Sequence, residues 1–125
     1  MSFNETALSF AASNRWDGTL DPHTHEGLVG VPGDGPYVRI QLYIKDRVVQ
    51  RARFETYTCP AARASCAVLC WAIEGKSAEI CEAVCAKDVV LLIQGLPDGK
   101  GHLPEMAVKA LHKALESGIE AKKVV

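Results

Sequence analysis

The sequence lacks the features that would place it in several special classes of protein. No run approaches the roughly 18 apolar residues that a membrane-spanning helix needs. The formal net charge is −1, so no excess of basic side chains favours binding to nucleic acid or to a membrane surface. The first ten residues, MSFNETALSF, lack the basic start and long apolar stretch of a signal peptide. We therefore expect a cytoplasmic protein that binds neither nucleic acid nor membranes.

The composition that remains is that of a globular domain. The chain has 125 residues, of which 48% are hydrophobic and 23% are charged. This is enough apolar material to form a core without disulfides or structural metals, and we expect one domain over residues 1–125. The five cysteines are an odd number. In a reducing compartment they are more typical of thiols, metal ligands or catalytic groups than of a disulfide framework.

The first third of the chain reads as a short helix followed by a long loop. Ser2 to Glu5 has the pattern of a capping box, which predicts a helix ending near Ala12. Residues 13–36 are rich in Gly, Pro, Asp and His and predict a loop. We interpret His23 and His25 within it as solvated, with loose metal binding as the alternative.

The period of the apolar residues then changes to two, which indicates strands. In YVRIQLYI, residues 37–44, every second side chain is apolar and aliphatic, as expected for a half-buried strand. A second strand is predicted from about Val48 to Thr58, with Ala52, Phe54 and Thr56 on one face. The short turn at Lys45–Asp46–Arg47 makes the pair an antiparallel hairpin.

Helices follow the hairpin, and proline, serine and glycine set their expected ends. Residues 89–94 fit a strand or, if Asp88 is a cap, a helix. Strands followed by helices predict an α+β fold, a small antiparallel sheet with helices packed on one face. The predicted helices run from Pro60 to about Glu74 with Gly75 as the stop, from a Ser77 cap through Cys85, and from Pro104 onward.

The cysteines differ in their expected roles. Cys59 precedes Pro60 and would cap the helix, where the helix dipole favours a reactive or metal-binding thiolate; a buried structural cysteine is the alternative. Cys66 and Cys70 share a face of a helix that is apolar nearly all round, which favours packing. Cys81 and Cys85 repeat this spacing, so the four could also form a four-thiolate metal site or two disulfides.

His102 and Asp34 are the other candidate ligands. His102 lies just before the last predicted helix, as Cys59 lies before an earlier one. If the two helix N-termini converge, a thiolate and an imidazole would face one site suited to an anionic cluster or a metal. Asp34, between two glycines, is a possible third ligand or a simple turn residue. His102 could instead be an exposed loop histidine, and His112 reads as a surface residue.

The segment ARFETYTCPAARASCAVLCWAIEGKS, residues 52–77, resembles the U-type iron–sulfur cluster scaffolds, IscU and the N-terminal domain of NifU. SNRWDGTLD, VGVP and GHLPEMAVKALHKAL extend the resemblance from about Ser13 to Leu115. It implies an α+β domain that assembles a [2Fe–2S] cluster, receives sulfur from a cysteine desulfurase and passes the cluster to Fe–S acceptor proteins. It implies a scaffold rather than an enzyme.

The resemblance also assigns candidate ligands. Cys59 falls on the family's second ligand cysteine and His102 on its histidine. Asp34 falls on the first cysteine and Leu103 on the third, so two thiolates are replaced. The family's nearby aspartate falls on Pro36, and its LPPVK chaperone segment is LPDGK here. A mixed Asp34–Cys59–His102 site suits iron or zinc as well as a cluster.

Two further functions remain open at this stage. One is an enzyme with Cys59 as nucleophile and His102 as base, although the sequence marks no substrate pocket or oxyanion hole. The other is a structural or interaction module held together by the helical CxxxC pairs.

Overall fold

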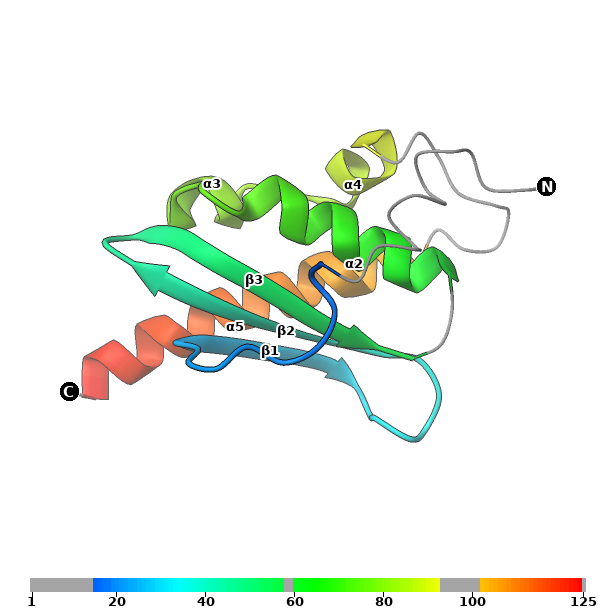
Figure 1. The fold of residues 1–125 in the computed structure, drawn as a ribbon, viewed down its shortest axis with the longest axis horizontal. Helices are drawn as coiled ribbons and strands as arrows, with labels where there is room; N and C mark the ends of the chain where they lie inside the picture. The colour runs from blue at the N-terminus through cyan, green and yellow to red at the C-terminus, as the bar shows by residue number, and fades with distance from the viewer. Residues whose placement is uncertain (1–14, 58–59, 93–101, 125) are drawn as a thin grey trace.

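The computed structural model describes residues 15–57, 60–92 and 102–124, and in this part of the chain it forms a three-stranded sheet with four helices (Figure 1). The strands follow the order β1-β2-β3 and are antiparallel. The predicted α+β class is therefore confirmed, while the helix expected over residues 2–12 lies outside the described residues. The elements are β1 (His25–Gly30), β2 (Tyr37–Lys45), β3 (Val48–Thr56), α2 (Pro60–Ile73), α3 (Ala78–Glu82), α4 (Ala86–Leu92) and α5 (His102–Val124).

The predicted hairpin is the centre of the sheet. Its alternating apolar side chains form a continuous buried face, because Ile40 pairs with Phe54 and Leu42 pairs with Ala52. The second strand ends at Thr56 rather than Thr58. At the turn, Asp46 and Arg47 both adopt left-handed backbone, with φ of 54° and 66°.

β1 is a strand that the sequence analysis assigned to a loop. His25 pairs with Leu42 and is only 6% exposed, so its interpretation as a solvated residue is wrong. The strand was hidden because HEGLVG carries two glycines instead of a clear apolar alternation. Gly27 faces α5 so closely that an added Cβ would lie 2.1 Å from the Ala110 carbonyl oxygen.

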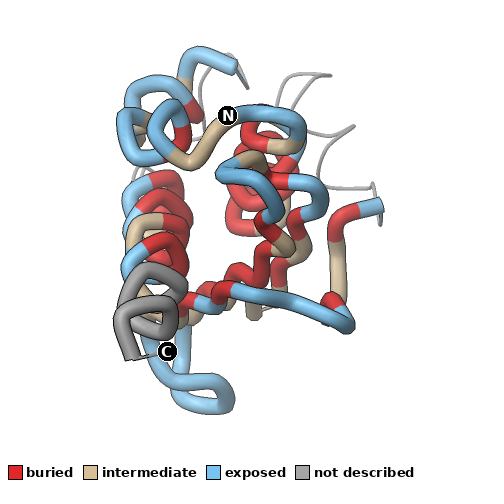
Figure 2. The backbone as a smooth tube through the Cα atoms, turned by 90° about the vertical axis from the view of Figure 1, so that its left-hand side faces the viewer, coloured by how far each residue is buried: buried red, intermediate tan, exposed pale blue. Residues whose placement is uncertain are grey.

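The helices cover one face of the sheet, as predicted. Both α2 and α5 pack on it, and the buried residues gather where they face the strands (Figure 2). α2 ends before Gly75, whose φ of 84° fits its predicted role as the stop. α5 starts at His102, two residues before Pro104; proline is tolerated there because N–H groups of the first turn have no intrahelical partner.

The helix predicted from Ser77 through Cys85 ends early, at Glu82, and a separate helix begins at Ala86. Ser77 does cap α3, because its side chain accepts a hydrogen bond from the Ile80 N–H. The chain leaves the helix at Ala83, and the Asp88 carboxylate accepts the Cys85 N–H at 2.9 Å to open α4. This side-chain bond explains why the ambiguous residues after Asp88 are helical as far as Leu92.

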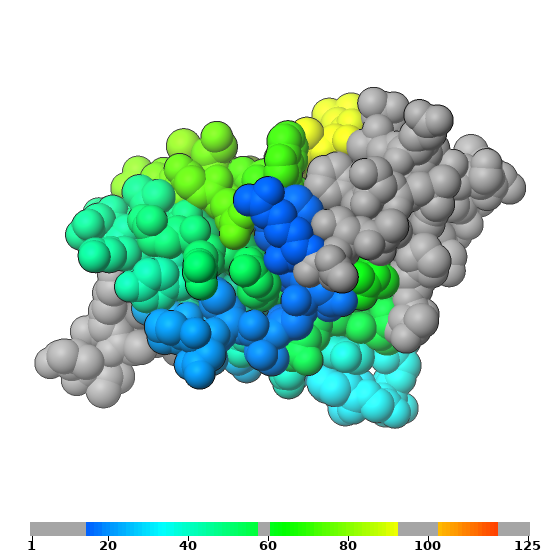
Figure 3. Space-filling view, in the orientation of Figure 1, coloured from blue at the N-terminus to red at the C-terminus, as the bar shows by residue number. Residues whose placement is uncertain are grey.

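The segment before β1 forms a strap across the sheet. Asp17 bridges to Phe54 along the free edge of β3, and the Trp16 indole N–H donates to Glu74 at 3.0 Å. Farther along, the Leu20 N–H donates to the buried Gln41 side chain at 2.8 Å. The space-filling view shows this blue segment lying on the face of the molecule turned toward the viewer (Figure 3). The strap therefore covers part of the sheet face that the helices leave open, around Gln41.

Candidate metal site

The predicted ligands belong to segments that meet at one end of the sheet. Val38, just after the loop that holds Asp34, pairs with Thr56, near the end of β3. The Thr56 hydroxyl donates to the Tyr37 carbonyl at 2.7 Å and fixes this end of the pair. The loop over residues 31–36 and the start of α2 therefore lie at the same end (Figure 1).

The N-termini of α2 and α5 also converge here. Leu103, in the first turn of α5, packs with Ala61 and Ala62 in the first turn of α2, and each of the three is 1% exposed. Tyr57 and Met106 pack against this cluster from its sides. The hypothesis of a shared site required the two helix N-termini to converge, and they do. The positive ends of two helix dipoles therefore face one region.

The structure describes Asp34 fully, only the backbone of His102, and not Cys59. Asp34 is exposed in its loop, between Gly33 and Gly35, which both have positive φ, and its N–H donates to the Val31 carbonyl at 3.0 Å. Asp34 therefore has the geometry of a turn residue. Within the described residues, its carboxylate accepts no side-chain hydrogen bond. Cys59 lies outside the described residues. His102 is the first residue of α5, and its side chain is outside them too.

An ion pair that the sequence analysis missed lies beside the start of α2. Arg63 donates to Asp17 at 2.8 Å, and its guanidinium carbon is 5.8 Å from the centre of the Phe54 ring. Both side chains are about one third exposed, so the pair contributes little stability by itself. Its effect is to tie the strap to the first two turns of α2. The sequence pointed to this contact only indirectly, because SNRWDG resembles a segment of the iron–sulfur scaffolds.

The cysteines of the helical CxxxC pairs do not form a second site. Cys66, Cys70 and Cys81 are fully buried, whereas Cys85 is exposed, and all four are free thiols. The disulfide hypothesis is therefore wrong, and so is the shared four-thiolate site. The prediction that Cys66 and Cys70 pack in the core is confirmed.

Burial also makes these thiols poor nucleophiles. It raises the pKa values of Cys66 and Cys70 well above the ordinary range, and raises the pKa of Cys81 to about 11 with a further contribution from Glu82. Because the thiolate is the reactive form, all three stay protonated and inert near neutral pH.

The remaining histidines have structural partners. His112 was expected at the surface, but it is half-buried and its Nε2 donates to the Val84 carbonyl at 3.1 Å, which links α5 to the chain between α3 and α4. His23 is exposed, as predicted, with its Nδ1 2.9 Å from the Leu20 carbonyl. Within residues 15–57, 60–92 and 102–124, no three His, Cys, Asp or Glu side chains gather to hold a metal ion.

The arrangement of a small antiparallel sheet, covering helices and converging helix N-termini has clear relatives. The chain matches the NifU-like N terminal domain family over residues 2–123, and it therefore belongs to that family. The iron–sulfur cluster assembly scaffold protein IscU of Escherichia coli is 30% identical over 129 residues, covering 98% of this chain and 100% of the relative. IscU of Aquifex aeolicus is 28% identical and covers 91% of this chain and 74% of the relative.

A solved structure supports the fold independently. The N-terminal part of a NifU-like protein from Brucella abortus superposes with a TM-score of 0.70 at 21% identity, covering 94% of each chain. The fold and family expected from the sequence resemblance are both confirmed. Within the described part of the chain, no helix is long and apolar enough to cross a membrane.

Proposed function

We propose that this protein is a scaffold of iron–sulfur cluster assembly whose cargo is iron, an iron–sulfur cluster or zinc. The observation that carries the proposal is the contact of Leu103 with Ala61 and Ala62, which joins the N-termini of α2 and α5. Cys59 directly precedes α2 in the sequence, and His102 begins α5. The curated relatives are named for the same scaffold role and match nearly the full length of this chain.

The proposed ligands are Asp34, Cys59 and His102, which supply one oxygen, one sulfur and one nitrogen donor. Leu103, at the position of the family's third ligand cysteine, is buried in an apolar contact and offers no donor. Sites that hold a [2Fe–2S] cluster use four cysteine or histidine ligands. The donor set therefore fits a single iron or zinc ion better than a cluster held by this chain alone.

The partners in this proposal follow from the scaffold role. A cysteine desulfurase would supply sulfur, and Fe–S acceptor proteins would receive the assembled cargo. A partner that contributes a thiolate could complete the ligands that this chain lacks. The single domain over residues 1–125 and the cytoplasmic location are parts of the same proposal, as is the absence of an enzymatic reaction.

Anaerobic metal loading tests the proposal. The purified protein is incubated with ferrous iron and sulfide, or with zinc, and the metal content and visible absorption are recorded after desalting. We expect about one metal site per chain with thiolate-to-iron charge-transfer absorption, and loss of both in Cys59→Ser. Asp34→Ala and His102→Ala should each weaken metal retention.

Cys85→Ser is the matched control, because it removes an exposed thiol that is not among the proposed ligands. It should load metal as the wild type does. If the wild type retains no more metal than Cys59→Ser, the proposed site does not exist. If Cys85→Ser also loses the metal, the binding reflects surface thiols in general and the proposal is equally wrong.

A further inference from the structure

A cavity of about 520 Å³ lies between the strap and the turn end of the β2–β3 hairpin, on the sheet face away from the helices. We call it the strap–hairpin cavity. Its volume falls within the roughly 300–1,000 Å³ that is typical of small-molecule sites. The residues that line it are Pro22 from the strap, Tyr43 and Lys45 from β2, and Gln50 and Arg51 from β3.

A β-bulge in β3 supplies two of these side chains. Arg51 pairs with Tyr43, and Val49 pairs with the next residue of β2. Gln50 is therefore an extra residue that has no partner in β2. Gln50 and Arg51 are both exposed, although the residues on either side of them are fully buried. A regular strand would turn one of two consecutive side chains toward the core, so the bulge is what places both on the outer face.

Hydrogen bonds hold the strap wall of the cavity against β2. Before Pro22, the Leu20 N–H donates to the Gln41 side chain at 2.8 Å. After it, the Thr24 hydroxyl accepts the Ile44 N–H at 2.9 Å. Pro22 lies between these two anchored points, so the cavity is formed before any ligand binds, as small-molecule sites usually are.

The cavity carries positive charge that has no ion-pair partner in the described chain. Lys45 and Arg51 are both exposed, and neither belongs to any ion pair of the described residues. No carboxylate lines the cavity, and the aspartates nearest in sequence, Asp21 and Asp46, are not among its walls. An anion is therefore the charge that this surface favours.

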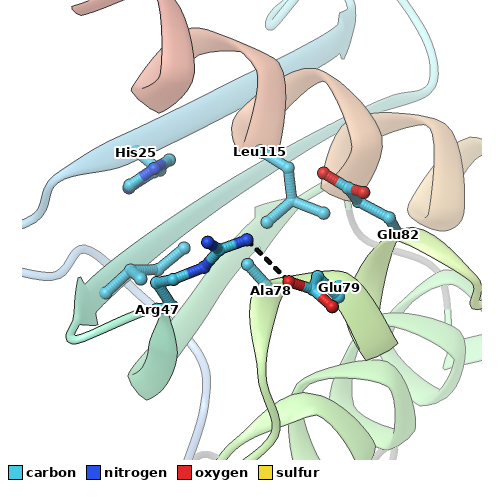
Figure 4. Close-up of a pocket in the computed structure, with 7 residues that line it drawn as sticks. His25, Arg47, Ala78, Glu79, Glu82 and Leu115 are labelled. Atoms are coloured by element: carbon cyan, nitrogen blue, oxygen red, sulfur yellow. Dashed lines mark hydrogen bonds and ion pairs between the residues drawn. The ribbon is translucent and has the colours of Figure 1, made fainter. Parts of the chain in front are cut away.

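A second cavity, on the helix side of the same turn, provides a contrast. It is lined by Arg47 together with Glu79 and Glu82, and Figure 4 shows that Arg47 already contacts Glu79. A cavity that holds both signs of charge favours neither an anion nor a cation. The strap–hairpin cavity has only one sign, so its charge selects a ligand.

The donors and the rings of the cavity narrow the class of anion. The planar guanidinium of Arg51 matches two oxygens of a phosphate, and Lys45 adds a compact second charge. A phosphate ester carries close to two negative charges at neutral pH and can neutralise both cations, whereas one carboxylate can neutralise only one. The ring of Tyr43, which is half-buried, and the ring of Pro22 offer flat surfaces to an aromatic group.

We propose that the strap–hairpin cavity binds a small phosphate ester that carries an aromatic ring. The phosphate lies between Lys45 and Arg51, and the ring lies against Tyr43 and Pro22. This binding goes beyond the proposed function, because it uses none of the proposed metal ligands.

A ¹⁵N NMR titration of the full chain tests the proposal with three probes: AMP, adenosine, which lacks the phosphate, and inorganic phosphate, which lacks the ring. We expect saturable shifts of amides over residues 43–51 with AMP, and about tenfold weaker binding of each of the other two probes. The double variant Lys45→Gln, Arg51→Gln should lose most of the AMP binding. The matched control Lys109→Gln, Lys113→Gln removes two exposed charges from α5 and should bind AMP as the wild type does.

A salt titration adds a measurement that needs no variant. Raising the salt from about 50 to about 500 mM should weaken AMP binding several-fold and leave adenosine binding unchanged.

Four outcomes would overturn the proposal. Two are equal affinity for AMP and adenosine, and unchanged AMP binding in the double variant of the cavity. The third is an equal loss in both double variants, which would show that AMP responds only to the overall charge. The fourth is tighter binding of the acidic peptide acetyl-Glu-Tyr-Glu-amide than of AMP, which would indicate a protein partner. Metal content is measured separately through Cys59→Ser, so failure here leaves the scaffold proposal standing, and the reverse also holds.

Discussion

The two ends of the β2–β3 hairpin are closed by different kinds of contact. At the turn end, main-chain bonds join the hairpin to the end of α2 and the start of α3: the Gly75 N–H donates to the Val49 carbonyl at 2.8 Å, and the Ala78 N–H donates to the Arg47 carbonyl at 2.8 Å. At the opposite end, Leu103 joins two helix N-termini through apolar side chains. Backbone bonds fix the turn end directly, whereas at the other end the described contact between the two helices is apolar.

The difference bears on what each end can do. The N–H groups in the first turn of a helix have no intrahelical partners, so a side-chain contact between two such turns leaves those groups for a ligand. Where main-chain bonds join the segments, the backbone is already used and recognition falls to side chains. This is why we place the proposed metal site at the end where the two helix N-termini meet.

The largest expected loss of stability comes from a substitution where β1 packs against α5. In Gly27→Ala, the new Cβ would meet the Ala110 carbonyl oxygen and the Ala114 nitrogen, 2.1 and 2.5 Å away. These are backbone atoms of α5, so the helix must shift along the sheet. We expect a loss of about 3 kcal/mol or more, measured by chemical denaturation.

Gly33→Ala is the comparison for this change. Gly33 has open space around its Cβ position but a φ of 89°, so the variant should lose only about 1 kcal/mol through backbone strain. Equal losses of stability in the two variants would show that the close approach of β1 and α5 does not require glycine at position 27.

A smaller effect should separate the two ends. Leu103→Ala removes the side chain that joins α2 and α5, and truncation of a buried leucine costs about 2–4 kcal/mol. We expect denaturation to show this loss, and metal loading to weaken because the two helix N-termini are no longer held together. Leu91→Ala, which truncates a side chain that is 74% exposed, should change neither the stability nor the metal loading. Unchanged metal loading in Leu103→Ala would mean that the proposed site does not depend on this contact.

The smallest expected effect lies at the turn end. Ser77→Ala removes the hydroxyl that caps α3 by accepting the Ile80 N–H at 3.2 Å. The loss of such a cap lowers the free energy of unfolding by about 1 kcal/mol. Hydrogen exchange should speed up at Ile80 and Cys81, because the first turn of α3 opens more often without its cap. Metal loading should not change. Ser77→Asp, which can cap the helix equally well, should restore the protection; if it does not, the cap is not the cause.

Most of the hairpin and α2 could be predicted because their signals are local. The alternation from Val38 to Ile44 defines a strand whatever it packs against, and Pro60 and Gly75 mark the ends of a helix through their own backbone preferences. The burial of Cys66 and Cys70 followed from a helix that is apolar nearly all round. The choice between strand and helix after Asp88 stayed open in the sequence, because the apolar run fits both and only the bond from the Cys85 N–H to the Asp88 carboxylate decides it.

The sequence by itself determined the fold class, the family and the burial of Cys66 and Cys70, because those depend on residue order and local periodicity. Only the tertiary structure decided that His25 is buried, that Gly27 has to be glycine, and that Pro22 and Arg51 border one cavity. The physical reason is the same in each case. Such properties are set by residues far apart in the chain that packing brings together, and no local pattern records which surface a side chain will meet.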